Sequence, residues 1–291
     1  MGLVAITGAN SASGLEILRE GSDSFIACVR SERAEAQLPG GVRRARIAYD
    51  DPASMDRALS GCSAVVHLPG VLIEGPGSSY RDANVVPAES TIAAALRAGV
   101  QKFVLVSAVG ADEHSRNAYY RSKGHAERLL RDSGLSYTIV RAPLVLGPAT
   151  EGGLALQRNA RGARARLLGG GQHLQQPLDL RDLANGARRA AEPEIAPKQV
   201  LEFVGPEAIS ERELVERAAR ELGHDVQIRS LPISWVRGAL RLKGLFGGLG
   251  FSVDALDVIT DDTTRDPEPA RAALQVELTD LEETIRYSVA E

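Results

Sequence analysis

Tyr119 and Lys123 are the residues of this sequence whose types and spacing best fit catalysis. They lie four positions apart in residues 117–132, which we expect to form a helix, so both side chains project from one face. A lysine ammonium beside a phenol stabilises the phenolate and lowers a tyrosine pKa that is normally about 10. Such a tyrosine can exchange a proton with a carbinol oxygen during hydride transfer. Tyr120 lacks this spacing, because residue 124 is glycine.

Three further polar residues fall near the expected carboxyl edge of a sheet. Ser107 ends the apolar run of residues 103–107, where its hydroxyl can hold a substrate carbonyl or satisfy local backbone. His67 lies near the end of an earlier run and is interpreted as a cofactor contact or as a histidine bonded to backbone. Asn84 is expected either to hold a water in a proton relay or to cap local backbone.

A glycine-rich turn follows the first apolar run of the chain and opens a helix. Small residues at a strand-to-helix junction let backbone N–H groups approach a pyrophosphate, and the helix N-terminus adds partial positive charge. Gly8 is expected to make the tight turn, and Gly14 to allow close packing of helix on strand. Ser11 stands where a second glycine is usual, so its hydroxyl donates to phosphate in one interpretation and its bulk weakens binding in the other. The residues expected to contact the cofactor here are Thr7, Gly8, Asn10, Ser11, Ala12 and Gly14.

The end of the second expected strand indicates which nicotinamide cofactor is preferred. An acidic residue there binds the ribose 2′-hydroxyl of NAD(H), whereas an arginine pairs with the 2′-phosphate of NADP(H). Arg30 occupies this position, with Ser31 and Arg33 close by. We therefore expect NADP(H) to be favoured over NAD(H), the alternative being that Arg30 is a solvated surface residue.

Short β-branched runs alternate with longer amphipathic segments in the first half of the chain. The runs expected to be strands are residues 3–7, 25–29, 42–47, 64–68, 103–107 and 137–141. The segments expected to be helices are residues 13–20, 52–59, 82–98 and 117–132. Because crossovers between parallel strands are right-handed, this order predicts a Rossmann-type, doubly wound α/β fold with helices on both faces of a parallel sheet. Such sheets bind ligands beyond the carboxyl ends of their strands.

The pattern changes after residue 148, where a segment rich in Gly and Arg begins. We expect residues 1–148 to form the NAD(P)-binding domain and residues 149–291 to form a smaller C-terminal α/β lobe that covers the substrate and packs partly on the main sheet. The elements expected after residue 148 are helices at 178–191, 211–222 and 278–288 and strands at 200–204 and 226–230. Residues 233–253 are apolar but interrupted by basic residues, so they are too short to span a bilayer. A core helix is favoured there over a lid or a helix lying on a membrane surface.

Composition narrows the classes of partner. The 34 basic and 38 acidic residues give a net charge of −4 and form no basic block of the kind that binds nucleic acid. We expect no export signal, and we expect Cys28 and Cys62 to be buried, reduced thiols of a cytoplasmic protein. The histidines have no metal-ligand spacing, so no metal site is predicted. The expected partner is a small molecule.

Together these motifs resemble the short-chain dehydrogenase/reductase superfamily in its extended or atypical form. The resemblance rests on residues 7–14, 64–68, 106–110, 119–123 and 137–143 and spans nearly the whole chain. Within the superfamily, residues 121–127 and 261–281 are similar to the NAD(P)H-binding branch that includes the nucleotide-binding accessory subunit of respiratory complex I.

The resemblance implies Tyr119 as the acid/base and Lys123 as its electrostatic partner and ribose ligand. It also implies a serine at position 107 or at position 108. This sequence has Ser107, but position 108 is alanine. If the serine of the family aligns with Ala108, then Ser107 points to the opposite side of the strand.

The leading interpretation is an NADP(H)-dependent oxidoreductase acting on a carbonyl or alcohol substrate, with Tyr119, Lys123 and Ser107 as catalytic residues. Ala108 and Ser11 favour the competing class, a non-catalytic NAD(P)H-binding structural or redox-sensing protein. A third class is an epimerase or isomerase, in which the hydride returns to the same substrate and the cofactor is recycled. The substrate stays open, because its contacts come from the segments after residue 148.

Overall fold

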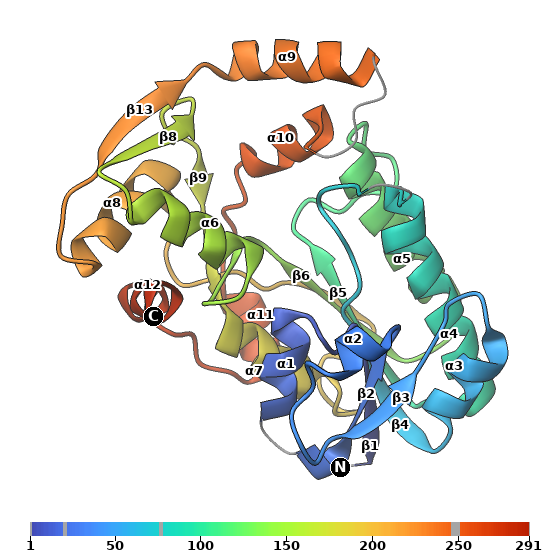
Figure 1. Ribbon diagram of the computed structural model, residues 1–291. Helices are drawn as coiled ribbons and strands as arrows, with labels where there is room; N and C mark the ends of the chain where they lie inside the picture. The colour runs from blue at the N-terminus through green and yellow to red at the C-terminus, as the bar shows by residue number, and fades with distance from the viewer. Residues whose placement is uncertain (1, 20–21, 76–77, 246–250, 291) are drawn as a thin grey trace.

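A seven-stranded parallel sheet forms the centre of the molecule (Figure 1). The computed structural model describes residues 2–19, 22–75, 78–245 and 251–290. The strand order is β11-β6-β5-β4-β1-β2-β3, and every neighbouring pair is parallel. The strands are β1 Leu3–Thr7, β2 Phe25–Val29, β3 Arg43–Arg46, β4 Cys62–His67, β5 Lys102–Ala108, β6 Tyr137–Ala142 and β11 Gln199–Glu202. The expected doubly wound α/β fold is confirmed, and the winding reverses between β1 and β4, whose carboxyl ends open the ligand edge.

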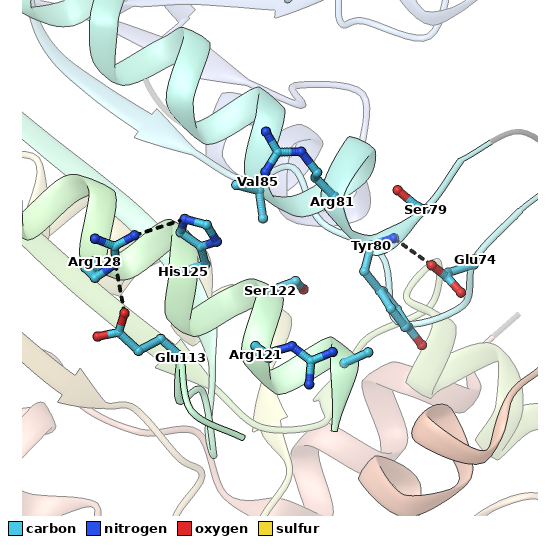
Figure 2. Close-up of a pocket in the computed structure, with 11 residues that line it drawn as sticks. Glu74, Ser79, Tyr80, Arg81, Val85, Glu113, Arg121, Ser122, His125 and Arg128 are labelled. Carbon is cyan, nitrogen blue, oxygen red and sulfur yellow. Dashed lines mark hydrogen bonds and ion pairs between the residues drawn. The ribbon is translucent and has the colours of Figure 1, made fainter. Parts of the chain in front are cut away.

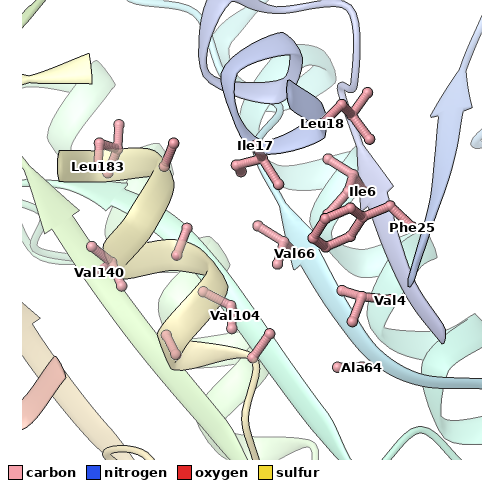
Figure 3. Close-up of a cluster of buried hydrophobic side chains, with 14 of the residues drawn as sticks. Val4, Ile6, Ile17, Leu18, Phe25, Ala64, Val66, Val104, Val140 and Leu183 are labelled. Atoms are coloured by element: carbon pink, nitrogen blue, oxygen red, sulfur yellow. The ribbon is translucent and has the colours of Figure 1, made fainter. Parts of the chain in front are cut away.

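Both faces of the sheet are buried, because apolar residues occupy successive positions along its central strands. One face packs against α1 Ala12–Arg19, the short α2 Glu32–Glu35, α7 Leu180–Ala190 and α11 Glu268–Leu274. Figure 3 shows this cluster, in which Ile17 of α1 lies near Val66 of the sheet and Leu183 of α7 lies near Val140. The opposite face packs against α3 Pro52–Leu59, α4 Val86–Ala98 and α5 Ala118–Asp132. The buried thiols of Cys28 and Cys62 lie on this second side and are unpaired.

Local capping explains where several of these helices begin and end. Asp51 accepts a hydrogen bond from the backbone of Ala53 at the start of α3, and Pro52 occupies the first turn. Asn117 caps α5 in the same way. The expected helix at 82–98 is present, but its first turn is a π-helix, η2 Arg81–Val85, and Gly99 ends α4 in the left-handed conformation.

A smaller lobe with its own core follows β6. It contains α6 Glu151–Ala160, α8 Glu211–Glu221 and α12 Leu281–Val289 around the parallel pair β8 Arg164–Leu168 and β13 Gln227–Leu231. Two short pairs complete it, β7 Val145–Leu146 with β10 Leu178–Asp179 and β9 Leu174–Gln175 with β12 Ile209–Ser210. The 3-10 helix η1 Ser22–Ser24 lies in the main body.

The segments after residue 148 contribute to both bodies. The helices α7 and α11 and the strand β11 pack on the main sheet, whereas α6, α8 and α12 build the lobe. The helix expected at 178–191 is wrong in its first two residues. Leu178 and Asp179 pair with β7 instead. The Asp179 carboxylate accepts a hydrogen bond from the backbone N–H of Arg181, and this cap makes α7 begin at Leu180.

The core helix expected within residues 233–253 is also wrong. The segment forms α9 Ile233–Leu245 and, after a gap in the described residues, α10 Val253–Ile259. No described side chain of α9 is buried, because this helix lies along the top of the molecule in Figure 1 and contacts α10. In the described parts of the chain, no helix has the length and apolar character needed to cross a membrane.

Candidate functional site

The glycine-rich turn after β1 forms a close approach between strand and helix. Gly8 has a φ of +72°, and the backbone N–H of Ser11 donates to its carbonyl at 2.9 Å. A Cβ on Gly14 would lie 2.5 Å from the carbonyl oxygen of Ala9, so this position requires glycine. The Ser11 hydroxyl accepts from the N–H of Gly14 at 3.1 Å. Ser11 thus caps α1, and its own O–H proton stays available to a ligand.

Two cavities meet at this turn. One of about 430 Å³ is lined by Gly8, Asn10 and Arg30, and the other, of about 520 Å³, is lined by Ala12 and Tyr119, among other residues. Ser11 and Gly70 line both cavities. The two cavities therefore form one trough along the carboxyl edge of the sheet, and we refer to the larger one as the cleft.

Thr7 and His67 link β1 to β4 beneath the trough. The Thr7 hydroxyl lies 2.8 Å from Nδ1 of His67, and both residues are fully buried. Burial and the nearby ammonium of Lys123 lower the pKa of His67 to about 3, so its imidazole is neutral at physiological pH. Its other nitrogen, Nε2, is buried without a hydrogen-bond partner in the described residues.

Arg30 lies exposed at the carboxyl end of β2 and lines the smaller cavity. It forms no ion pair with the rest of the described chain, so its guanidinium is free to bind an anion. Ser31 caps α2 by accepting from the N–H of Ala34 at 3.2 Å. Tyr49, which sequence reasoning did not single out, also lines this cavity; burial raises its pKa, and the charge of Arg30 opposes that rise.

Lys123 and Asn84 are buried and line neither cavity, but their side chains lie next to Gly70, which lines both. The Lys123 ammonium donates to the carbonyl of Val106 at 3.0 Å, and a Cβ on Gly70 would lie 3.1 Å from that nitrogen. Burial lowers the pKa of Lys123 to about 8, although Glu127 opposes the shift. The Asn84 amide is held by the backbone of Val71 and by Ser122, which fits the expected backbone cap.

Tyr119 reaches the cleft from the first turn of α5. Its hydroxyl makes no hydrogen bond to any described residue, and its ring meets that of Tyr80 edge to face with centroids 5.9 Å apart. Burial and the Tyr80 phenol raise the pKa of Tyr119 to about 12. The shift is thus opposite to the lowering by Lys123 that the sequence predicted. Desolvation of the phenolate dominates, and the carbonyl of Val106 accepts from the Lys123 ammonium.

The structure does not bring Ser107 to the cleft. Its hydroxyl donates to the Glu127 carboxylate at 2.6 Å, and that fully buried carboxylate also accepts from Arg141 at 2.7 Å. Because side chains alternate along a strand, Val106 and Ala108 line the cleft instead. At the position where the resemblance implies a serine in the cleft, this protein therefore has the methyl group of Ala108.

Sequence reasoning missed several polar residues of the cleft. Tyr120 lines it and donates to the Asp261 carboxylate at 3.1 Å. Gln175 Oε1 and Thr263 Oγ1 are buried, line the cleft and have no partner among the described residues. No spacing in the sequence relates these residues, because they come from α5, from β9 and from the chain after α10.

A third cavity of about 470 Å³ lies on the outer surface between η2 and α5 (Figure 2). The Arg128 side chain pairs with Glu113 at 2.8 Å, and Arg121 donates to backbone carbonyls, so these two guanidinium groups are already occupied. Tyr80 also lines this cavity, and its ring packs against Tyr119 on the cleft side.

Residues 8–165 match the model of a family described as NAD(P)H-binding. This match covers more than half of the chain and includes the glycine turn, Arg30, Tyr119 and Lys123. The chain belongs to this NAD(P)H-binding family.

The chain is also similar to two curated relatives. It is 28% identical over 244 residues to a (4-alkanoyl-5-oxo-2,5-dihydrofuran-3-yl)methyl phosphate reductase of Streptomyces griseus, a match that covers 83% of this chain and 81% of the relative. It is also 28% identical over 177 residues to the mitochondrial NADH dehydrogenase 1 alpha subcomplex subunit 9 of Dictyostelium discoideum, covering 61% of this chain and 49% of the relative. The expected similarity to a complex I accessory subunit is confirmed.

Solved structures with the same fold bind both kinds of nicotinamide cofactor. MoeE5 in complex with UDP-glucuronic acid and NAD is similar with a TM-score of 0.77 and 21% identity, over 99% of this chain and 98% of that chain. A quinone oxidoreductase of Escherichia coli in complex with NADPH is similar with a TM-score of 0.74 and 21% identity, over 97% of this chain and 98% of that chain. At this identity the likeness concerns the fold.

The residues around the trough of this NAD(P)H-binding protein fit such a dinucleotide. The glycine turn leaves backbone N–H groups open at the start of α1, and the trough continues from Arg30 past Gly70 to Tyr119. The charged residues that line the cleft in the described chain are Glu151 and Asp261, and the other lining residues are mainly apolar. Within the described part, the cleft thus offers no cationic side chain to a negatively charged substrate.

Proposed function

We propose that this protein is an NADPH-dependent reductase of an uncharged, largely apolar carbonyl compound. The observation that carries the proposal is the free hydroxyl of Tyr119 in an apolar cleft, on the same helix face as the buried Lys123. Relatives named as reductases support this class of reaction. Gln175 and Thr263 offer their unpartnered oxygens to a neutral polar group of the substrate.

In the proposed reaction, the cofactor supplies the hydride and Tyr119 supplies the proton. When bound, the reduced nicotinamide supplies a hydride to the carbonyl carbon. Tyr119 donates its phenolic proton to the carbonyl oxygen, so the tyrosine O–H bond breaks as the alcohol O–H bond forms. Tyr119 is protonated before the reaction, as a proton donor must be, because its pKa lies above physiological pH. Lys123 stabilises the phenolate that remains until solvent returns the proton.

Replacing Tyr119 tests this mechanism. Tyr119→Phe removes one hydroxyl and keeps the ring, so NADPH affinity should stay nearly constant while turnover falls by about 10²–10⁴-fold. Lys123→Ala should lower cofactor affinity and rate together, because it removes a charge at the junction of the two cavities. The measurement is NADPH absorbance in a screen of uncharged ketones and aldehydes, followed by both variants on the best substrate. Tyr137→Phe, outside the cleft, is the control, and full activity in Tyr119→Phe would rule out this proton donor.

The preference for NADP(H) is part of the proposal and rests on the exposed, unpaired Arg30 at the end of β2. A charge-assisted pair between its guanidinium and the 2′-phosphate is worth about 1.5–3 kcal/mol, or roughly 10- to 100-fold in affinity. Arg30→Ala should therefore weaken NADPH binding by about that factor and change NADH binding little. Calorimetric titration of both cofactors measures the effect, and equal affinities in the unaltered protein would end the assignment.

A non-catalytic NAD(P)H-binding or redox-sensing role is the second candidate. It is favoured by Ala108, which gives the cleft a methyl group, and by the Ser107 hydroxyl, which donates to Glu127. Tight NADPH binding without turnover of any compound in the same screen would favour this role over the reductase.

A further inference from the structure

Two large apolar side chains of α9 project into solvent. Trp235 is 78% exposed and Leu242 is 62% exposed. They are seven positions apart, so they lie on one face of the helix, two turns from each other, with the exposed Gly238 and Ala239 between them. The opposite side of α9 is tied to α10 by an ion pair between Arg237 and Asp257 at 2.7 Å.

The segment from β13 through α9 carries only basic charges, although the protein as a whole is acidic and Asp225 and Asp254 flank the segment. Residues 226–253 contain Arg229, Arg237, Arg241 and Lys243 and no Asp or Glu. The strand β13 carries Arg229 and runs through Pro232 into α9, and both elements lie at the same end of the molecule in Figure 1.

The neighbouring strand β8 adds further exposed arginines to this end. Arg166 is the register partner of Arg229, so two positive charges stand side by side on the outer face of the β8–β13 pair. Like charges at such positions destabilise a sheet unless an anion lies between them. Arg164, Arg166, Arg229 and Arg241 have no ion pair or hydrogen bond from their side chains within the described residues, whereas Arg181, Arg217 and Arg265 are all paired.

We propose that α9, with the outer face of β8 and β13, docks on the surface of a membrane that contains anionic lipids. A tryptophan and a leucine on one face of a basic helix are suited to the boundary between headgroups and acyl chains, where Trp is enriched. Unpaired arginines beside this face bind lipid phosphates. A protein partner is less favoured, since the apolar face is narrow and flanked by basic residues that would need acidic partners.

Docking in this way would place the mouth of the cleft next to the lipid. The helix α10 lies between α9 and the cleft, which it lines with Val258 and Ile259. Its Asp254 carboxylate accepts from the backbone N–H of Ala118 at 3.0 Å, one residue before Tyr119. An apolar carbonyl compound dissolved in the membrane would then reach the cleft without crossing water. The docking itself does not depend on whether the protein turns over a substrate.

Trp235 is the single tryptophan of the chain, so its fluorescence reports this face directly. The experiment mixes the full-length protein with vesicles of phosphatidylcholine, with or without added phosphatidylglycerol, and measures emission wavelength and co-sedimentation. A blue shift and binding that need phosphatidylglycerol are expected. Each basic residue near an anionic surface contributes about fivefold in affinity, so Arg166→Gln with Arg229→Gln should weaken binding by about 25-fold.

Leu242→Ser tests the apolar face and keeps the tryptophan reporter. It should weaken vesicle binding by about tenfold or more, whereas Leu96→Ser, at an exposed leucine of α4, should leave it unchanged. NADPH titration verifies that every variant is folded. The proposal is overturned if anionic vesicles cause no blue shift, or if Leu242→Ser and the arginine pair bind as the unaltered protein does. If the protein self-associates and does not bind vesicles, and if Leu242→Ser abolishes this self-association, the face is a protein interface.

Discussion

At the scale of single residues, the charge of each group at the site depends on how burial shifts its pKa. His67 and Lys123 are both buried near the junction of the two cavities, and each has its pKa lowered chiefly by desolvation. Their mutual repulsion adds to the shift of His67. A neutral imidazole can hold Thr7 through Nδ1, whereas an imidazolium at this position would be an uncompensated buried charge.

His67 should therefore make the protein sensitive to acid. The folded state keeps its imidazole neutral down to about pH 3, while the unfolded chain binds a proton below about pH 6.5. The unfolded state thus binds more protons between these values, and stability falls as pH is lowered through this window, by up to about 1.4 kcal/mol per pH unit. Above pH 6.5 the effect is absent.

Urea unfolding at several pH values between 6.5 and 4.5 measures this dependence. His67→Asn removes the titrating group and should flatten the slope of the unfolding free energy against pH, even if it lowers stability at neutral pH. His114→Asn, at an exposed position, is the control. An unchanged slope in His67→Asn would show that other groups cause the acid sensitivity.

At the scale of elements, the turn between β1 and α1 combines two functions. Gly8 and Gly14 let the helix approach the strand closely, and Ser11 caps the helix whose N-terminus faces the trough. The same backbone geometry thus fixes the packing of α1 and the direction of its free N–H groups.

Gly14→Val should disrupt both functions of this turn. The added Cβ would meet the Ala9 carbonyl at 2.5 Å, so backbone must move, at a cost of about 1–3 kcal/mol in the free energy of unfolding. NADPH affinity should fall at least about tenfold, because the N–H groups lose their alignment. Urea unfolding and a fluorescence titration measure the two effects. Gly40→Ala, where a Cβ meets nothing within 4 Å, should change neither; normal affinity in a folded Gly14→Val variant would place the pyrophosphate elsewhere.

At the scale of the whole molecule, the cleft lies between the main sheet, the lobe and α10. The sheet contributes Val106 and Ala108, the lobe contributes Gln175, and α10 contributes Val258 and Ile259. Such a cleft accommodates an apolar molecule. Its described lining residues include no cationic side chain that could pair with a phosphate group.

This charge pattern predicts that nucleotide sugars are not substrates. UDP-glucose titrated into the NADPH-loaded protein should bind more weakly than about 1 mM, because its diphosphate would lose water without gaining a cation. Calorimetry measures this, with the preceding NADPH titration as the control for folded protein. Saturable binding of UDP-glucose in the micromolar range would contradict the prediction and favour an epimerase.

The sequence by itself determined the parts of this protein that depend on local patterns. β1 and β2 have the predicted bounds, and the glycine turn and the Tyr119–Lys123 spacing lie on the expected elements. Strand alternation, helix periodicity and the conformational needs of glycine act over a few residues, so they can be read along the chain.

Only the tertiary structure decided which of these residues face the cleft and how they are charged. Ser107 turns to Glu127 while Ala108 lines the cleft, and Trp235 stays exposed where a core helix was expected. The pKa of Tyr119 rises through its burial and through the charge interaction with the Tyr80 phenol. Burial and charge pairing join residues that are far apart in the chain, such as Tyr120 and Asp261, so no local pattern contains them.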